Sequence, residues 1–301
     1  MNAENPLSLH GVFPPITTPF KQNGDIDFRH LATNLERWNR QPLTGYVVGG
    51  SNGEFVSLSS EERVDVVRAA CEEAPPDRLV IAGSGMQSTR GTIELTNQMA
   101  EVGADAAIVV TPSYYKTMMS TTVLENHYRQ IADASLIPIL LYNVPANTGV
   151  ELEIEAVVRL ATHPNVIGIK ESGGSVAKIG AMVHKTPEDF QVLAGSAGFM
   201  LAALEVGAVG VIAALANIAG KELVEILTQF YVGEHDAARA MQLRLIEANT
   251  AVTARYGIPG LKAAMDMLGY FGGPVRSPLL SLGEEEREPL RQILFEAGLL
   301  H

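Results

Sequence analysis

The chain has 301 residues, a formal net charge of -12 and an isoelectric point near 5.1, and hydrophobic residues make up 47% of it. This composition is typical of a compact protein rather than a disordered one, and the acidic balance, without any lysine- or arginine-rich run, disfavours nucleic acids and anionic membranes as partners. The single cysteine, Cys71, excludes an intrachain disulfide; no apolar run reaches membrane-spanning length and the opening residues lack a secretory signal, so we expect a cytoplasmic protein.

Short branched, apolar segments alternate with longer segments of helical periodicity along most of the chain. Strands are predicted at 11–18, 46–48, 79–82, 106–110, 138–142, 166–170, 191–194 and 209–213. Helices are predicted at 27–40, from 59 onward, and at 89–102, 122–132, 154–161, 176–184 and 199–206. The repeat of roughly thirty residues is the size of one strand-crossover-strand unit.

Eight such strands favour an α/β fold of the (β/α)8 TIM barrel type over an open doubly wound sheet. After residue 216 the strand signals stop, and helices are predicted at 221–231, 234–254, 259–267 and 284–297. We therefore predict a catalytic barrel at 1–216 and a C-terminal helical region at 217–301. No linker rich in proline or serine separates them, so the helical region is expected to pack on the barrel.

Lys170 ends the sixth predicted strand, among the apolar residues of 166–169 and directly before a polar, glycine-rich segment. Strand alternation places Val166, Gly168 and Lys170 on one face, with open space beside the amine at the glycine. Apolar surroundings disfavour the charged form of a lysine, and a neutral amine is what a Schiff-base nucleophile requires. The alternative is an ordinary lysine that caps a strand end and points into solvent.

Other polar residues gather at the ends of neighbouring strands, where a barrel of this type has its active site. Tyr142 ends the fifth strand, so its phenol could share a pocket with Lys170 and move protons; the alternative is a core aromatic whose hydroxyl binds backbone. Ser51 and Asn52 lie between glycines, in a turn whose amides could hold a carboxylate. The turns at Gly83 and Gly195 are weaker signals, which we interpret as pocket walls rather than phosphate sites.

No cofactor or metal is indicated by the sequence. The histidines are scattered, and no pair of them has helical or strand spacing with a nearby carboxylate or cysteine. None of the glycine-rich turns matches a phosphate-binding loop or a dinucleotide fingerprint.

Taken together, the strand-end segments GSNGE, YNVP and IKESGG resemble the class I, Schiff-base pyruvate aldolases that include dihydrodipicolinate synthase and N-acetylneuraminate lyase. The resemblance runs nearly end to end. Within the family, GSNGE, TPSYY, YNVPANTG, LAGSAGF and the tail YGIPGLK are most similar to 4-hydroxy-2-oxoglutarate aldolase. The resemblance thus implies a lyase that cleaves 4-hydroxy-2-oxoglutarate to pyruvate and glyoxylate through an imine on Lys170.

The resemblance also implies roles for single residues. Ser51, Tyr114 and Tyr142 would form a hydroxyl relay, with Tyr114 reaching across a subunit interface, which implies a homodimer or homotetramer. The amides of Ser51 and Asn52 would hold the pyruvate carboxylate. The remaining substrate-binding residues would be Ser172, Asn147 and Gly195.

One departure bears on the choice of substrate. Dihydrodipicolinate synthases carry an arginine after the YNVP motif, which holds the carboxylate of the aldehyde, whereas this chain has Asn147. Loss of a bidentate guanidinium should weaken that substrate badly. The alternatives are another pyruvate-dependent lyase of the family, such as dihydrodipicolinate synthase or a 2-keto-3-deoxy sugar acid aldolase or dehydratase, and, more remotely, a non-catalytic ligand-binding barrel.

Overall fold

A computed structural model describes residues 7–300 of the chain, and it contains a single sheet of eight parallel strands. The strands are β1 Gly11–Phe13, β2 Gly45–Val48, β3 Leu79–Gly83, β4 Ala106–Val110, β5 Ile139–Asn143, β6 Val166–Glu171, β7 Gln191–Ala194 and β8 Gly210–Ile212. The helices between them are α1 Phe28–Asn39, α2 Ser60–Glu73, α3 Thr89–Glu101, α4 Thr121–Ala134, α5 Pro145–Thr148, α6 Ile154–Leu160, α7 Val176–Lys185 and α8 Met200–Glu205. The predicted (β/α)8 barrel is confirmed.

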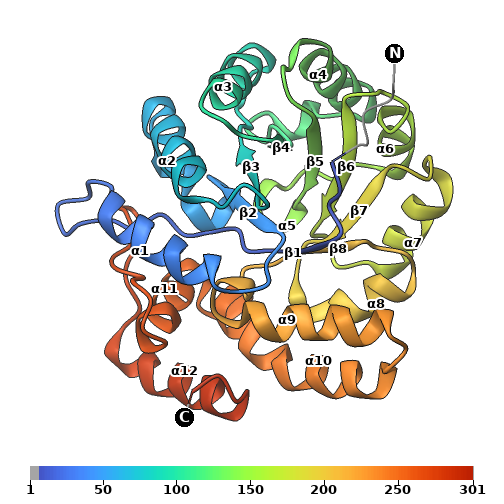
Figure 1. The fold of residues 1–301 in the computed structure, drawn as a ribbon. Helices are drawn as coiled ribbons and strands as arrows, with labels where there is room; N and C mark the ends of the chain where they lie inside the picture. Colours follow the sequence, from blue (N-terminus) through green and yellow to red (C-terminus); the bar gives the residue numbers. More distant parts are fainter. Residues whose placement is uncertain (1–6, 301) are drawn as a thin grey trace.

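The strands follow one another in the order β1-β8-β7-β6-β5-β4-β3-β2, with the helices arranged around them (Figure 1). The barrel closes between the segment that follows β1 and strand β2, over fewer residues than the other strand pairs. There the amide of Ile16 donates to the carbonyl of Val47 at 2.9 Å. Strand β1 ends at Phe13, earlier than predicted, because Pro14 and Pro15 have no amide proton to extend a ladder.

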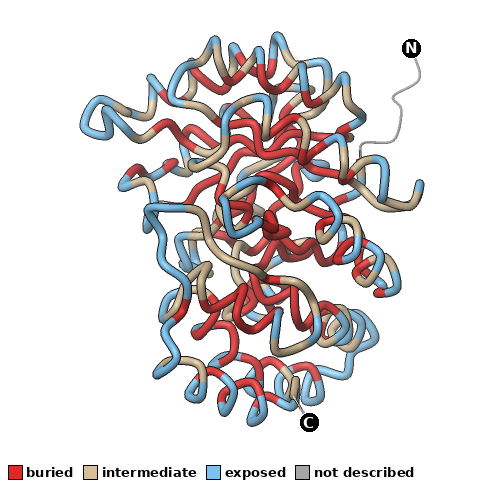
Figure 2. Tube along the Cα trace, turned by 90° about the vertical axis from the view of Figure 1, so that its left-hand side faces the viewer, coloured by how far each residue is buried: buried red, intermediate tan, exposed pale blue. Residues whose placement is uncertain are grey.

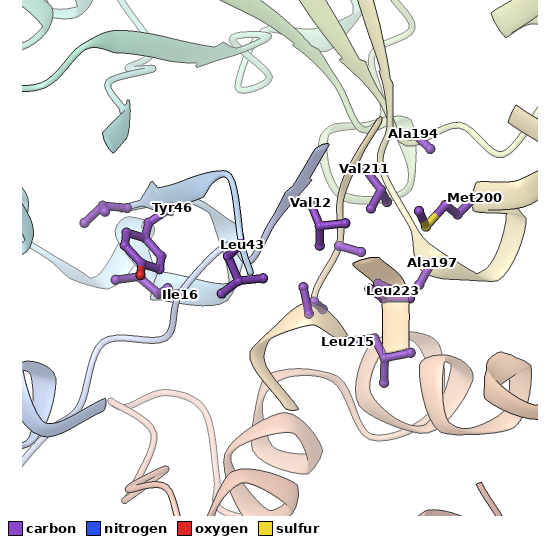
Figure 3. Close-up of a cluster of buried hydrophobic side chains, with 14 of the residues drawn as sticks. Val12, Ile16, Leu43, Tyr46, Ala194, Ala197, Met200, Val211, Leu215 and Leu223 are labelled. Carbon is purple, nitrogen blue, oxygen red and sulfur yellow. The ribbon is translucent and has the colours of Figure 1, made fainter. Parts of the chain in front are cut away.

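Two apolar layers pack on opposite faces of the strands. Inside the barrel, one buried cluster includes Phe13, Val47, Ile108 and Leu140. Outside, the alternate strand residues pack against the helices, and Figure 3 shows part of this layer. In Figure 2 the buried segments accordingly run through the middle of the molecule, while exposed segments form its outline. The polar strand ends are therefore held by two independently packed layers.

The helix that begins near residue 59 starts as its sequence predicts. The Ser59 hydroxyl accepts from the amide of Glu62 at 3.2 Å, and the Glu62 carboxylate accepts from the amide of Ser59 at 2.9 Å. This reciprocal capping box satisfies two donors that a helix otherwise leaves unpaired.

Helices α9 Ala216–Tyr231, α10 His235–Thr250, α11 Gly257–Met267 and α12 Glu284–Glu296 follow the last strand. Helix α9 follows β8 after a short connection and contains a non-helical residue at Ala219. Helix α10 continues into a π-helical stretch at Ala251–Arg255. In Figure 1 these helices lie together on one side of the barrel. The division at residue 216 stays a prediction. None of the helices within 7–300 combines the length and apolar character needed to cross a membrane.

His127, on α4, predicts a loss of stability in mild acid. The imidazole is buried, its Nδ1 lies 2.9 Å from the Thr89 hydroxyl, and its Nε2 contacts no hydrogen-bond partner among residues 7–300. Burial lowers the pKa of His127 from 6.5 to about 4, so between these values the unfolded chain binds a proton that the folded chain does not. The contribution of the neutral His127 to the free energy of unfolding is fully present above pH 6.5. About 3 kcal/mol of it is lost as the pH falls toward 4.

Denaturant unfolding of the wild type and of a His127→Gln variant, followed from pH 7.5 to 4.5, checks this expectation. Both proteins titrate the same carboxylates, so only the histidine differs between them. The free energy of unfolding should fall less steeply with pH in the variant. If the free energy of unfolding fell equally with pH in both proteins, His127 would not contribute to the loss of stability in acid.

Candidate active site

Lys170 and Tyr142 lie side by side at the carboxyl ends of adjacent strands. They are register partners between β6 and β5, and the lysine Nζ lies 4.4 Å from the centre of the tyrosine ring. Both belong to the inner, buried side of the barrel, and Lys170 is only 5% exposed. The structure therefore contradicts the alternative of a solvent-facing lysine and brings the amine and the phenol into one site.

The path of β6 differs from the predicted alternation in one respect. A register shift against β5 lies at Val166–Gly168, where Ile167 has no partner of its own. Val166 consequently packs in the outer layer with Ile169, while Ile167 packs inside. The prediction that Val166 shares the face of Lys170 was wrong, because such a bulge resets the alternation.

Gly168 also has a role other than the predicted open space beside the amine. A Cβ at this position would lie 2.2 Å from the carbonyl oxygen of Gln191 on β7. The glycine therefore allows close approach of the neighbouring strand β7. The space that a side chain at residue 168 would need is occupied by the backbone of β7.

The electrostatics of the pair favour proton transfer by Tyr142. Burial opposes ionisation of this phenol, but the charge of Lys170 and the hydroxyl of Ser51 outweigh burial, so the pKa of Tyr142 lies below its usual value. The Ser51 hydroxyl lies 3.4 Å from the phenol oxygen. A phenol whose ionisation is favoured in this way, beside an amine, can give and accept protons while a carbonyl adduct forms.

Ser51 and Asn52 form a 3₁₀ turn, Ser51–Gly53, directly after β2. The first amides of such a turn have no acceptor inside it. The turn also carries the Ser51 hydroxyl toward Tyr142. It can thus offer both amide donors and a hydroxyl to a small carboxylate beside Lys170.

Ser172 and Gly195 meet on the other side of Lys170. The Ser172 hydroxyl is buried and has no hydrogen-bond partner among the described residues, and a Cβ at Gly195 would lie 1.9 Å from its oxygen. Gly195 therefore shapes the position of Ser172, whose hydroxyl is left for a ligand.

Two predicted residues lie at the surface of the single chain. Asn147 is exposed on α5, in the segment that follows Tyr142. Tyr114 follows β4 and is 79% exposed, and its backbone amide donates to the side chain of Gln87. Of the three residues predicted to form a relay, the single chain brings only Ser51 and Tyr142 within hydrogen-bond distance, and Tyr114 lies apart from them.

An outer-face network supports the two strand ends, and our sequence analysis missed it. Glu171 is fully buried and accepts from the side-chain amide of Asn143 at 2.9 and 3.1 Å and from the backbone amide of Gly173, with the ammonium of Lys178 at 3.2 Å. Asn143 accepts in turn from the amide of Leu152 at 2.9 Å. The signal was present in the alternation, since residues next to Tyr142 and Lys170 on adjacent strands must meet on the opposite face.

A buried arginine lines a small cavity beside the site. This cavity, of about 10 Å³, is bordered by Gly49, Gly50, Arg63 and Tyr142 among others. The Arg63 guanidinium donates to the carbonyls of Gly83 at 2.6 Å and Gly85 at 3.2 Å, and burial lowers its pKa to about 10. A larger cavity, of about 290 Å³, lies near α11 and contains none of the predicted site residues, so convergent chemistry and not size identifies the site.

No group of three or more histidine, cysteine, aspartate or glutamate side chains within 7–300 is arranged to hold a metal ion. The amine, the hydroxyls and the backbone donors are the groups that this site offers to a substrate.

Comparison with known proteins adds a family to this geometry. Residues 8–297 match the model of the dihydrodipicolinate synthetase family. A relative from Methanothrix thermoacetophila, named 4-hydroxy-tetrahydrodipicolinate synthase, is 38% identical over 289 residues, which are 95% of this chain and 96% of the relative.

Two solved structures are similar in both sequence and fold. Dihydrodipicolinate synthase from Bacillus anthracis is 34% identical with a TM-score of 0.93, covering 96% of this chain and 98% of its own. The chloride-inhibited dihydrodipicolinate synthase from Acinetobacter baumannii, solved with pyruvate, is 33% identical with a TM-score of 0.93, covering 97% and 100%. The similarity therefore extends over nearly the whole length of both chains.

Proposed function

The chain belongs to the dihydrodipicolinate synthetase family, and we propose that it is a pyruvate-dependent carbon-carbon lyase whose imine forms on Lys170. The observation that carries this proposal is the pairing of a buried amine with the phenol of Tyr142, 4.4 Å from the ring centre, at adjacent strand ends. Members of the family are lyases of the class I aldolase type, and the relative solved with pyruvate supports pyruvate as the shared substrate.

In the proposed mechanism, the neutral amine of Lys170 attacks the ketone carbon of pyruvate or of a longer 2-oxo acid. Tyr142 delivers a proton to the departing hydroxyl as water leaves, which gives a protonated imine. The phenolate that remains then takes a proton from the adjacent carbon, and the electrons of that C–H bond move into the imine to form an enamine. The amides of Ser51 and Asn52 hold the carboxylate next to the ketone. Formation of a carbon-carbon bond uses the enamine as nucleophile, and cleavage runs the same steps in reverse.

The names of the relatives support the synthase reaction more strongly than the aldolase reaction. A 4-hydroxy-tetrahydrodipicolinate synthase joins pyruvate to an aldehyde, and the carbons that remain after pyruvate is removed from its product belong to 2-amino-4-oxobutanoate. We therefore propose condensation of pyruvate with this amino aldehyde as the leading assignment.

Asn147 favours a second candidate, cleavage of 4-hydroxy-2-oxoglutarate to pyruvate and glyoxylate. A synthase needs a cation for the carboxylate of its aldehyde, and this chain has an exposed asparagine in the segment where synthases carry arginine. A neutral amide gives a carboxylate fewer and weaker hydrogen bonds than a guanidinium does.

One experiment tests the shared chemistry and then separates the two reactions. The protein is reduced with borohydride in the presence of pyruvate, and separately of 4-hydroxy-2-oxoglutarate, and the modified peptide is identified by mass. A pyruvyl adduct on Lys170 is expected. Consumption of pyruvate with 2-amino-4-oxobutanoate is then compared with release of pyruvate from 4-hydroxy-2-oxoglutarate, and failure to trap any adduct on folded protein would remove the proposal.

Asn147→Arg should change the balance between the two substrates. A guanidinium at this position is expected to raise kcat/KM for 2-amino-4-oxobutanoate by roughly tenfold or more, because one charge-assisted bidentate contact is added. Asn147→Lys is the matched control, since it adds the charge without the planar fork. An unchanged ratio of synthase to aldolase activity in both variants would show that Asn147 does not face the second substrate.

The exposed apolar surface after β4 supports assembly into a homo-oligomer. Tyr114, Tyr115 and Met118 are all more than half exposed in the single chain, and such a group of large side chains commonly marks an interface. We propose that a second copy covers this surface and that each Tyr114 completes the relay of its neighbour. A molar mass of one chain by light scattering would contradict this assembly.

A further inference from the structure

The carboxylate-binding turn ends in a strained residue. Glu54, which follows the Ser51–Gly53 turn, has a φ of 55° and is the one residue other than glycine with positive φ within 7–300. Such a conformation persists in a non-glycine residue only when the surrounding structure enforces it, and it is found preferentially at functional sites.

The side chain of Glu54 is buried and is held from the C-terminal part of the chain. Its Oε1 lies 2.6 Å from the ammonium of Lys262, on α11, and its Oε2 accepts from the backbone amide of Arg276 at 2.9 Å. Lys262 is 1% exposed. A fully buried ion pair requires hydrogen bonds on all sides to offset its desolvation.

Lys262 makes further hydrogen bonds of this kind, and one of its partners, Thr18, contacts the Ser51–Gly53 turn. Its ammonium donates to the carbonyl of Thr18 at 2.9 Å and to that of Pro274 at 2.8 Å. The Thr18 hydroxyl donates to the carbonyl of Gly53 at 2.7 Å, and the amide of Glu54 donates to the carbonyl of Ser51 at 3.1 Å. One buried ammonium thus fixes both the end of the turn and the segment that lies against it.

Arg276 adds further contacts between the C-terminal part of the chain and the residues that follow the turn. Its guanidinium binds both oxygens of Glu62 at 2.7 Å and the carbonyl of Ser57 at 2.8 Å. The C-terminal part of the chain therefore contacts the turn and the start of α2 at several points that are far away in sequence.

We propose that Lys262 is a positioning residue for substrate binding, which holds Glu54 and so orients the amides of Ser51 and Asn52 toward the pyruvate carboxylate. On this view the C-terminal helices are part of the binding machinery and not only a cover for the barrel. The inference rests on the proposed imine chemistry, and it assigns the contribution of Lys262 to the carboxylate and not to the ketone.

The test uses a double variant, Lys262→Met with Glu54→Gln, which removes both buried charges. A single Lys262→Met change would leave a buried, unpaired carboxylate and endanger folding. Rates of borohydride trapping are measured against concentration for pyruvate and for hydroxyacetone, a ketone of similar size without a carboxylate. We expect half-saturation by pyruvate to rise by roughly tenfold or more, while trapping with hydroxyacetone stays within about twofold of the wild type.

A second double variant, Glu125→Gln with Arg159→Met, is the matched control. It removes an ion pair of 2.6 Å that joins α4 to α6 on the outside of the barrel, and it should leave both probes unchanged. Equal losses with pyruvate and hydroxyacetone in the Lys262 variant, or no loss with either, would overturn the inference. No adduct in the wild type would instead remove the proposed function, so the two failures are distinguishable.

Discussion

Replacement of Lys170 by methionine is expected to reduce turnover by a factor of about 10⁴ or more, because the covalent intermediate can no longer form. Methionine is close to lysine in length and fills the same space, and Lys170 lies on the inner face among apolar residues such as Leu140 and Leu193. The variant should therefore fold. Turnover with 2-amino-4-oxobutanoate and with 4-hydroxy-2-oxoglutarate, together with borohydride trapping by pyruvate, measures the effect.

An exposed lysine provides the control for this variant. Lys221→Met, on α9, removes an amine at the surface and should retain both turnover and the pyruvyl adduct. If the Lys170→Met protein kept aldolase or synthase activity, or still gave a reduced adduct at another lysine, imine formation at Lys170 would be wrong. Unfolding midpoints of the two variants show whether any loss follows from misfolding.

The fold could be predicted because its information is local and repeated. Each strand is a short branched segment bounded by turn residues, and for β4 and β7 the predicted and observed ends coincide. The helix boundaries follow from capping residues such as Ser59. Parallel strands present their carboxyl ends at one edge, so the meeting of Lys170 and Tyr142 followed from their positions at the ends of two consecutive strands.

The features that the sequence analysis missed depend on contacts between distant segments. The bulge at Ile167 appears only in the pairing of β6 with β5, and nothing in the local pattern of β6 marks it. Glu54 and Lys262 are more than two hundred residues apart, yet they form a buried pair. The segment GSNGE includes Glu54, but the sequence does not show what the glutamate contacts. In the structure its partner is Lys262 on α11.

Tyr114 shows a third kind of difficulty. Its role in the proposed relay depends on a second copy of the chain, so neither one sequence nor one folded chain contains the complete site. Within a single chain its ring packs edge-on against that of Tyr115 at a centroid distance of 5.0 Å. The relay of Ser51 and Tyr142 is the part that one chain provides by itself.

Tyr142→Phe should lower kcat by about 10² to 10³, because the proposed proton donor and acceptor for carbinolamine dehydration is removed while the ring that faces Lys170 is kept. The substitution deletes only the hydroxyl, which lies 3.4 Å from that of Ser51. Since the pKa of Tyr142 lies below its usual value, the part of the pH-rate profile that this phenol sets should also disappear. Steady-state rates across pH, with single-turnover trapping by pyruvate, measure both effects.

Comparing kcat with the final amount of pyruvyl adduct on Lys170 shows whether Tyr142 transfers protons or only packs against the lysine. With Tyr142→Phe the pyruvyl adduct on Lys170 should still form after long incubation, only more slowly, since the amine and the Ser51–Gly53 turn proposed to bind the carboxylate remain. Ser51→Ala is the graded control, and about tenfold loss is expected from it because one hydroxyl contact is removed and the phenol stays. A Tyr142→Phe protein with unchanged kcat and an unchanged pH profile would show that the phenol only packs against Lys170, and proton transfer would then have to be assigned to water or to Ser172, whose buried hydroxyl has no partner among residues 7–300.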